Sequence, residues 1–149
     1  MHKQSRYDQY YIDMAHVTSS MSHDTKTKVG CLIVKDGQIL SQGWNGMPSG
    51  MDNDTRCGNE CTRKEVIHSE ANALMKLVKN GGGSAGATIY CTHSPCWECS
   101  KLIIQAGITR VVFSTVYDPS SWQFLKEQLG EENIHGGIRP SDRLSSGED

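Results

Sequence analysis

The sequence has 149 residues, the length of one ordinary domain, and this is enough to bury a core without disulfides or oligomerisation. Its formal net charge of -2 gives no general attraction to phosphates, so polymeric nucleic acid is not expected as a partner. The sequence carries neither the apolar core of a signal peptide nor an apolar run of membrane length. We therefore expect a single cytoplasmic domain over residues 1–149, with no membrane partner.

The first predicted elements are a helix and a hairpin. Apolar residues near the N-terminus recur at helical spacing and predict an amphipathic helix that ends before Ser22 and covers a sheet. Its apolar positions are Tyr7, Tyr10, Tyr11, Met14, Val17 and Met21. Strand-forming residues fill positions 29–35 and 38–44, separated by Asp36 and Gly37, a pair that tolerates the positive φ angles of a type I′ turn. The pattern therefore predicts an antiparallel hairpin.

A long loop and a second helix follow the hairpin. Residues 45–63 are rich in Gly, Pro, Asn, Asp and Thr and show little periodicity, which predicts an irregular loop. Loops of that length in compact domains are usually functional. The second helix is expected over residues 69–80, and Gly81 and the two glycines after it end it. One face of this helix carries Ala71, Leu74, Met75 and Val78.

The remaining pattern predicts a parallel crossover. Strands are expected over residues 88–92 and 110–114, joined by a helix with Pro95 in its first turn. The apolar stripe of this helix is formed by Cys99, Leu102, Ile103 and Ala106. A further helix is expected over residues 122–129. Strand, helix and strand in succession imply a right-handed parallel connection, which joins the hairpin in one mixed sheet. We therefore predict an α/β fold, a three-layer α/β/α sandwich with a mixed central sheet.

Two helix starts carry the candidate chemistry. His68 and Glu70 open the second helix, and Pro95, Cys96 and Cys99 open the third. The order His-x-Glu followed by Pro-Cys-x-x-Cys is the signature of the zinc deaminases. Two thiolates and an imidazole leave a tetrahedral Zn²⁺ with one open position for water. The pattern predicts His68, Cys96 and Cys99 as zinc ligands and Glu70 as the catalytic group that moves protons between water, ring nitrogen and departing amine.

Two other classes of protein remain open from these residues. A structural zinc module would take a fourth ligand from Cys57 or Cys61, and a redox enzyme would use Cys96 and Cys99 as a dithiol without His68 or Glu70. We expect the six cysteines to be buried thiols or metal ligands and not a disulfide framework, because a reducing compartment keeps thiols free. Buried and inert thiols are expected at Cys31 and Cys91.

The sequence resembles the deoxycytidylate deaminases, within the cytidine deaminase superfamily, over about residues 28–114. The resemblance rests on GWNGMPSG at residues 43–50, HSEANA at 68–73 and SPCWEC at 94–99, with QAGI at 105–108. It implies a cytidine deaminase-like fold and the hydrolysis of dCMP to dUMP and ammonia. The alternative is a deaminase of another cytosine or adenine nucleoside or nucleotide. His93 stands where the family usually carries an apolar residue, and we leave it out of the expected core site.

The resemblance also implies several binding residues. Asn45 would bond the deoxyribose hydroxyl, unless it only forms a turn, and Tyr117 would line the pocket near the nucleotide, unless it only packs. Some members bind a second zinc near the loop that carries Cys57 and Cys61, although no convincing further pair of ligands is present. Many members are homo-hexamers activated by dCTP with Mg²⁺ and inhibited by dTTP. The effector site is expected at Lys26, Lys28, Gly43, Gly46, Gly50 and Asn72.

Overall fold

The computed structural model describes residues 3–58 and 61–145, so the two ends of the predicted domain and residues 59–60 lie outside the described residues. The chain begins with α1 (Lys3–Ser19), β1 (Gly30–Lys35) and β2 (Gln38–Trp44). It continues with α2 (Ser69–Lys79), β3 (Thr88–His93), α3 (Trp97–Gln105), β4 (Arg110–Thr115), α4 (Pro119–Leu129), the 3₁₀ turn η1 (Glu131–Asn133), β5 (Ile134–His135) and α5 (Asp142–Ser145).

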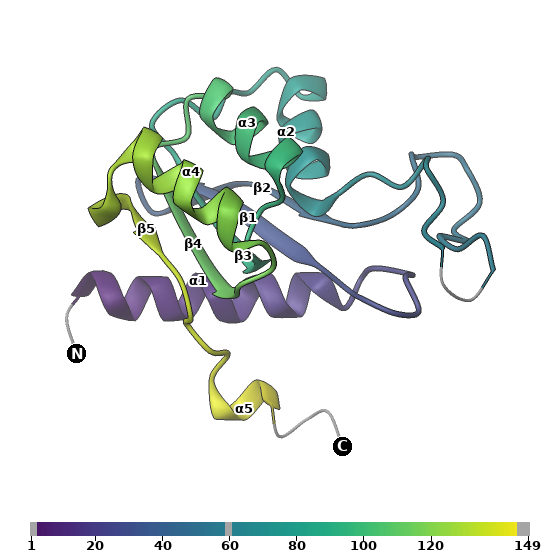
Figure 1. Cartoon of the computed structure of the whole chain (residues 1–149), viewed down its shortest axis with the longest axis horizontal. Helices are drawn as coiled ribbons and strands as arrows, with labels where there is room; N and C mark the ends of the chain where they lie inside the picture. The colour runs from purple at the N-terminus through teal and green to yellow at the C-terminus, as the bar shows by residue number, and fades with distance from the viewer. Residues whose placement is uncertain (1–2, 59–60, 146–149) are drawn as a thin grey trace.

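The strands form one mixed sheet in the order β2-β1-β3-β4-β5. β1 pairs antiparallel with both β2 and β3, whereas β4 pairs parallel with β3 and β5. The helix α1 lies on one face of this sheet, and α2, α3 and α4 lie on the other (Figure 1). This arrangement confirms the predicted three-layer α/β/α sandwich. The short β5 was not predicted, because two residues carry no readable periodicity.

Alternating residues of the strands belong to two separate hydrophobic cores, one on each face of the sheet. Ile33, Ile89 and Val111 belong to the larger cluster, which α2, α3 and α4 cover. Their chain neighbours Leu32 and Tyr90 belong to the smaller cluster beneath α1. Adjacent strand residues point to opposite faces of a sheet, so β1, β3 and β4 each contribute to both clusters.

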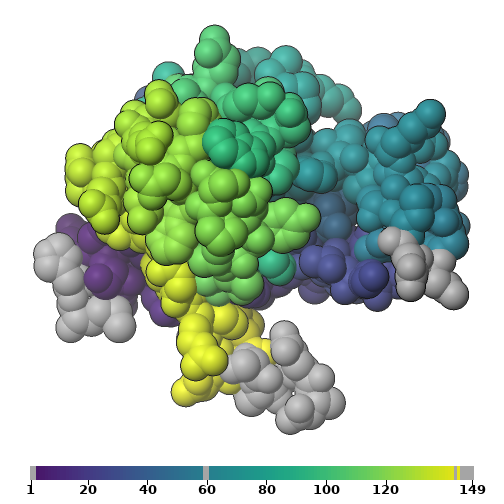
Figure 2. Space-filling view, viewed as in Figure 1, coloured from purple at the N-terminus to yellow at the C-terminus, as the bar shows by residue number. Residues whose placement is uncertain are grey.

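The hairpin between β1 and β2 has the predicted turn. Asp36 and Gly37 have φ angles of 51° and 75°, as a type I′ turn requires. The segment after β2 is irregular, as predicted, apart from isolated bridges at Gly46↔Ile67 and Arg56↔Thr62. It projects from the sheet in Figure 1 and forms a lobe at one end of the molecule in Figure 2.

The predicted buried face of α1 is right at Tyr11 and wrong at four other positions. Asp8, Tyr11, Ile12, Ala15 and Thr18 are buried, whereas Tyr7, Tyr10, Val17 and Met21 are exposed. The reason is a buried ion pair: the two guanidinium nitrogens of Arg110 donate to the Asp8 carboxylate at 2.6 and 2.8 Å. Tyr90 also donates to Asp8, at 2.8 Å. Burial would raise the pKa of Asp8, but the hydrogen bonds from Arg110 and Tyr90 lower it, so an acid can occupy the face against the sheet.

The helix α2 also presents a different face from the predicted one. Leu74 is buried together with Glu70, Ala73 and Leu77, whereas Met75 and Val78 are exposed. The buried face of α2 therefore includes a polar residue, Glu70. Apolar periodicity alone does not identify such a face. In α3, Cys99 and Ile103 are buried as predicted, but Leu102 is 46% exposed.

Candidate metal centre and substrate pocket

The three predicted zinc ligands meet at two helix starts. His68 and Cys96 are the N-cap residues of α2 and α3, and Cys99 lies in the first turn of α3. The Nδ1 atom of His68 lies 3.4 Å from the Cys96 sulfur and 3.5 Å from the Cys99 sulfur. All three ligand atoms lie within 4.8 Å of one another. Histidine and cysteine from separate elements therefore converge on one point.

The donor set fits zinc. One imidazole and two thiolates are ligands that Zn²⁺ accepts, and three protein ligands leave a fourth position for a water or substrate, as in catalytic sites. Within residues 3–58 and 61–145, no other histidine, cysteine or carboxylate joins this cluster. His68 would bind through Nδ1, because that nitrogen faces the two sulfurs.

Contacts in the first turn of α3 favour the thiolate form of Cys96, which is the form that binds a metal. The Cys96 sulfur accepts a hydrogen bond from the Cys99 amide at 3.5 Å, which caps the helix. Hydrogen bonds with Cys99 and His68 lower the pKa of Cys96, so this thiol is the first of the pair to lose its proton. Pro95 lies just before the cap and not in the first helical turn, contrary to the prediction. Its carbonyl instead accepts a hydrogen bond from Ser121 at 2.7 Å and ties α3 to α4.

The fourth predicted residue, Glu70, lies buried beside this cluster. It occupies the first turn of α2 with 4% of its surface exposed, and it lines the same pocket as His68 and Cys96. The Ser69 hydroxyl donates to its carboxylate. Burial raises the pKa of Glu70, more than the hydrogen bond from Ser69 lowers it. A carboxyl whose pKa is raised by burial holds a proton more readily than an ordinary glutamate, which suits a group that takes up and releases protons.

A pocket of about 280 Å³ opens in front of these groups. Asn45 lines it, and Tyr117, which is 70% exposed, lines its rim. The Asn45 side chain accepts from the Val29 amide at 2.8 Å and donates to the Thr27 carbonyl at 2.9 Å. These two bonds fix the amide in the pocket wall and leave one N–H and one lone pair for a ligand.

The six expected effector-site residues do not gather in this pocket, where Lys26 alone of the six lies in the wall. Gly43 has a packing role, because a Cβ atom there would lie 2.3 Å from the Ser69 carbonyl oxygen. Asn72 donates to the Trp44 carbonyl at 3.0 Å. Lys28 is exposed, and Gly50 has a φ angle of 89° that suits a glycine in a turn.

Two expectations for the remaining cysteines have different outcomes. Cys31 and Cys91 are buried free thiols, as predicted. Cys57 and Cys61 are neither thiols nor metal ligands but form a disulfide, so the expectation of no disulfide is wrong for this pair. A disulfide removes both thiolates from metal binding, which argues against a second zinc here and against a fourth ligand from this loop. Cys57 and Cys61 are four positions apart in the sequence, and their Cα atoms lie 5.1 Å apart, which is close enough for a disulfide.

The pocket wall includes residues that the sequence did not indicate, among them three with ionisable side chains. His93, at the end of β3, was left out of the core site but lines the pocket and bonds Thr92 at 2.9 Å. Asp24 and Arg56 also line it and form an ion pair at 2.6 Å. Their segments lack periodicity, so no sequence pattern showed which side chains point inward. One feature of the sequence indicated that His93 lies in the site, namely its position at a strand end just before Cys96.

Proteins with related sequences are known. The sequence pattern described as "Cytidine and deoxycytidylate deaminase zinc-binding region" matches residues 5–115. The deoxycytidylate deaminase of Saccharomyces cerevisiae is 34% identical over 131 residues, which make up 80% of this chain and 42% of the yeast protein. This chain therefore spans less than half of that relative. The deoxycytidylate deaminase of Mycobacterium phage D29 is 33% identical over 121 residues, with 72% of this chain and 93% of the phage protein covered.

A solved structure shares the fold. The crystal structure of the dCMP deaminase from the cyanophage S-TIM5, in complex with dCMP and dUMP, matches with a TM-score of 0.82 and 35% sequence identity. The match covers 91% of this chain and 98% of that chain. The mixed sheet with helices on both faces is therefore the fold of that structure as well.

Metal content tests the ligand cluster. The variant Cys96→Ser should bind Zn²⁺ more than about 100-fold more weakly, because loss of an outer-shell partner alone costs ~10- to 100-fold and this change removes a ligand. Zinc per chain, measured by plasma mass spectrometry after dialysis against a weak chelator, checks this. The matched control is Glu98→Gln, an exposed residue between the two cysteines, which should keep its zinc. Unchanged zinc affinity in Cys96→Ser would remove this cysteine from the ligand set.

Proposed function

The chain belongs to the cytidine and deoxycytidylate deaminase family, and from this membership we propose that it hydrolyses dCMP to dUMP and ammonia. The observation that carries the proposal is the buried Glu70 carboxyl beside a three-ligand cluster in one pocket. A structural zinc module has no use for an open coordination position or a buried acid. A dithiol redox enzyme has no use for His68 or Glu70.

Each residue has a distinct role in the proposed reaction. His68, Cys96 and Cys99 hold Zn²⁺, which when bound supplies a water nucleophile at neutral pH. Glu70 takes a proton from the attacking water and passes it to the ring nitrogen, and then moves the second proton of that water from the ring-carbon hydroxyl to the departing amine. The overall reaction consumes one water and releases one ammonia. The raised pKa of Glu70 supports these transfers, because the carboxyl can be protonated and deprotonated in the same cycle.

Asn45 and Tyr117 complete the proposed substrate site. The free N–H and lone pair of Asn45 can donate to and accept from a sugar hydroxyl. The exposed ring of Tyr117 at the rim offers an apolar surface to the nucleoside.

The proposal extends to regulation and assembly. By family resemblance, the enzyme would be a cytoplasmic homo-hexamer, activated by dCTP with Mg²⁺ and inhibited by dTTP through a site at Lys26, Lys28, Gly43, Gly46, Gly50 and Asn72. Exposed apolar residues support self-association, among them Tyr10, Val17 and Met21 near α1 and Met75 and Val78 on α2. No helix within the described residues has the length and apolar character to cross a membrane.

The role of Glu70 is tested by Glu70→Gln. This variant should retain its zinc and lose turnover by at least ~10²- to 10⁴-fold, the usual contribution of a general acid–base group. Ammonia release and zinc content are measured on the same preparation. Glu98→Gln, which changes an exposed carboxylate in the same region, should match the wild type. An active Glu70→Gln, or one without zinc, contradicts the assignment.

Substrate choice is tested with a panel of dCMP, deoxycytidine, CMP, cytidine and single-stranded DNA. We expect the highest kcat/KM for dCMP, because each buried donor left without its acceptor costs about 1–3 kcal/mol. Ammonia release is followed with and without a chelator, and the chelator should abolish activity. Equal kcat/KM for dCMP and deoxycytidine would contradict a nucleotide substrate.

Regulation is tested by dCMP saturation curves without effector, with dCTP plus Mg²⁺, and with dTTP. An effector must bind the active and inactive states with different affinity in order to shift their populations. We expect the apparent dCMP affinity to change about 5- to 150-fold, the range of typical allosteric coupling. Three superimposable hyperbolic curves would rule out regulation, and plain competition by dTTP would place it in the catalytic pocket.

A further inference from the structure

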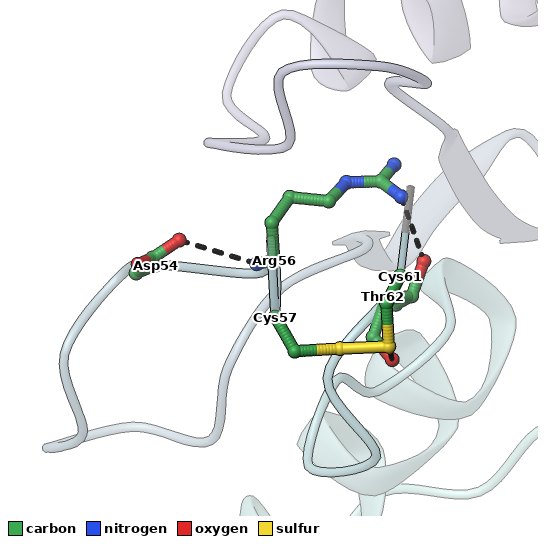
Figure 3. Close-up of a disulfide and its surroundings, with 5 residues drawn as sticks. All are labelled: Asp54, Arg56, Cys57, Cys61 and Thr62. Atoms are coloured by element: carbon green, nitrogen blue, oxygen red, sulfur yellow. Dashed lines mark hydrogen bonds between the residues drawn. A yellow bond between two sulfur atoms is a disulfide. The ribbon is translucent and has the colours of Figure 1, made fainter. Parts of the chain in front are cut away.

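Arg56 extends from the long loop after β2 into the wall of the catalytic pocket. Its side chain is only 13% exposed, although its backbone lies in an irregular segment. The Nη2 atom donates to the Asp24 carboxylate at 2.6 Å, and Nη1 donates to the Thr62 hydroxyl at 3.0 Å. Figure 3 shows the guanidinium reaching across the loop toward Thr62. Two partners on two segments therefore fix the orientation of this side chain.

The loop around Arg56 is cross-linked. The disulfide joins Cys57, the residue after Arg56, to Cys61, the residue before Thr62 (Figure 3). The Cys57 amide donates to the Cys61 carbonyl at 3.0 Å, and Arg56 pairs with Thr62 as an isolated bridge. The Arg56 amide also donates to the Asp54 carboxylate at 3.2 Å. The disulfide and the backbone bonds therefore fix the segment that carries Arg56.

The Asp24 carboxylate, which accepts from Arg56, also accepts hydrogen bonds from three other groups. Asp24 is 2% exposed and accepts from the amides of Lys26 and Thr27 and from the Thr55 hydroxyl, in addition to Arg56. Burial would raise the pKa of Asp24, but hydrogen bonds from Thr27, Arg56 and Lys26 lower it to about 2. Asp24 is therefore ionised near neutral pH, and its carboxylate accepts from four donor groups.

Arg56 keeps donors that the protein does not use. A guanidinium has five N–H groups, and the bonds to Asp24 and Thr62 need only two of them. Nε is buried without a partner among the described residues. The unused N–H groups on Nη1 and Nη2 are therefore the donors available to a ligand in the pocket. Lys26 lines the same wall and adds a second positive charge.

We propose that Arg56 binds the phosphate of the nucleotide substrate and so determines specificity for the nucleotide over the nucleoside. This inference rests on the proposed function. A guanidinium donates two parallel hydrogen bonds to a phosphate, and its fixed geometry lowers the entropy cost of binding. Asp24 and Thr62 are positioning residues, because they orient Arg56. The competing role for Arg56 is purely structural, as the tie between its loop and Asp24.

The test compares kinetics for dCMP and deoxycytidine in the wild type and in Arg56→Gln. We expect kcat/KM for dCMP to fall on the order of 10- to 100-fold, mainly through KM, as for a lost hydrogen bond to a charged group. Deoxycytidine kinetics should stay within about 2-fold. The matched control is Arg63→Gln on the same loop, whose guanidinium pairs with Asp52 and Glu65 outside the pocket. This control should leave both substrates unchanged.

Binding of dUMP and of deoxyuridine, measured by calorimetry, gives a readout that needs no turnover. The wild type should prefer dUMP, and Arg56→Gln should lose that preference. If Arg56→Gln does not fold, Arg56→Lys keeps the charge without the paired donors and should show a smaller loss for dCMP alone. Equal losses for dCMP and deoxycytidine, or no loss for either, overturn the proposal. A wild type that deaminates neither compound refutes the proposed function, whereas dUMP binding still decides the role of Arg56.

Discussion

The contact between α2 and the hairpin is the constraint on which the site depends. At Gly43 the backbone of β2 lies so close to Ser69 and Ala73 that any side chain would collide with the helix. The Cys31 thiol donates to the Ser69 carbonyl at 3.2 Å, and the Ser41 hydroxyl donates to the Ala73 carbonyl at 2.8 Å. Because the first turn of α2 is fixed in this way, its N-cap imidazole and its buried carboxyl have one orientation. A looser contact would leave both free to turn.

The second half of the site depends on the parallel crossover. β3 and β4 are parallel, so the segments that follow them emerge at the same edge of the sheet, where ligands bind in α/β proteins. Cys96 follows β3 and Tyr117 follows β4, and the amide of Tyr117 donates to the Ser94 hydroxyl at 2.6 Å. The metal end of the pocket is therefore built on regular elements. The opposite wall, with Asp24 and Arg56, is built on loops held by hydrogen bonds and a disulfide.

Sequence patterns predicted the parts of the molecule that repeat or that carry a fixed spacing. The hairpin at Asp36, the crossover and the grouping of His68 with Cys96 and Cys99 all follow from such patterns. The predicted buried faces of α1 and α2 were wrong at several positions, because each helix carries a buried acid, Asp8 or Glu70, that apolar periodicity excludes. Arg56 was missed because an irregular loop has no periodicity, and its orientation is set by a partner that lies 32 residues away in the sequence.

The ion pair between Asp8 and Arg110 also bears on how the chain reaches this fold. Its two residues lie 102 positions apart, whereas the turn at Asp36 joins neighbouring strands. A short hairpin forms in about 1–10 μs, but a contact between distant residues must first overcome the entropy of closing a long loop. The hairpin can therefore form early, whereas the ion pair between Asp8 and Arg110 cannot form until β4 has been synthesised. Because α1 precedes β4 in the chain, its buried carboxylate is synthesised before the guanidinium that neutralises it.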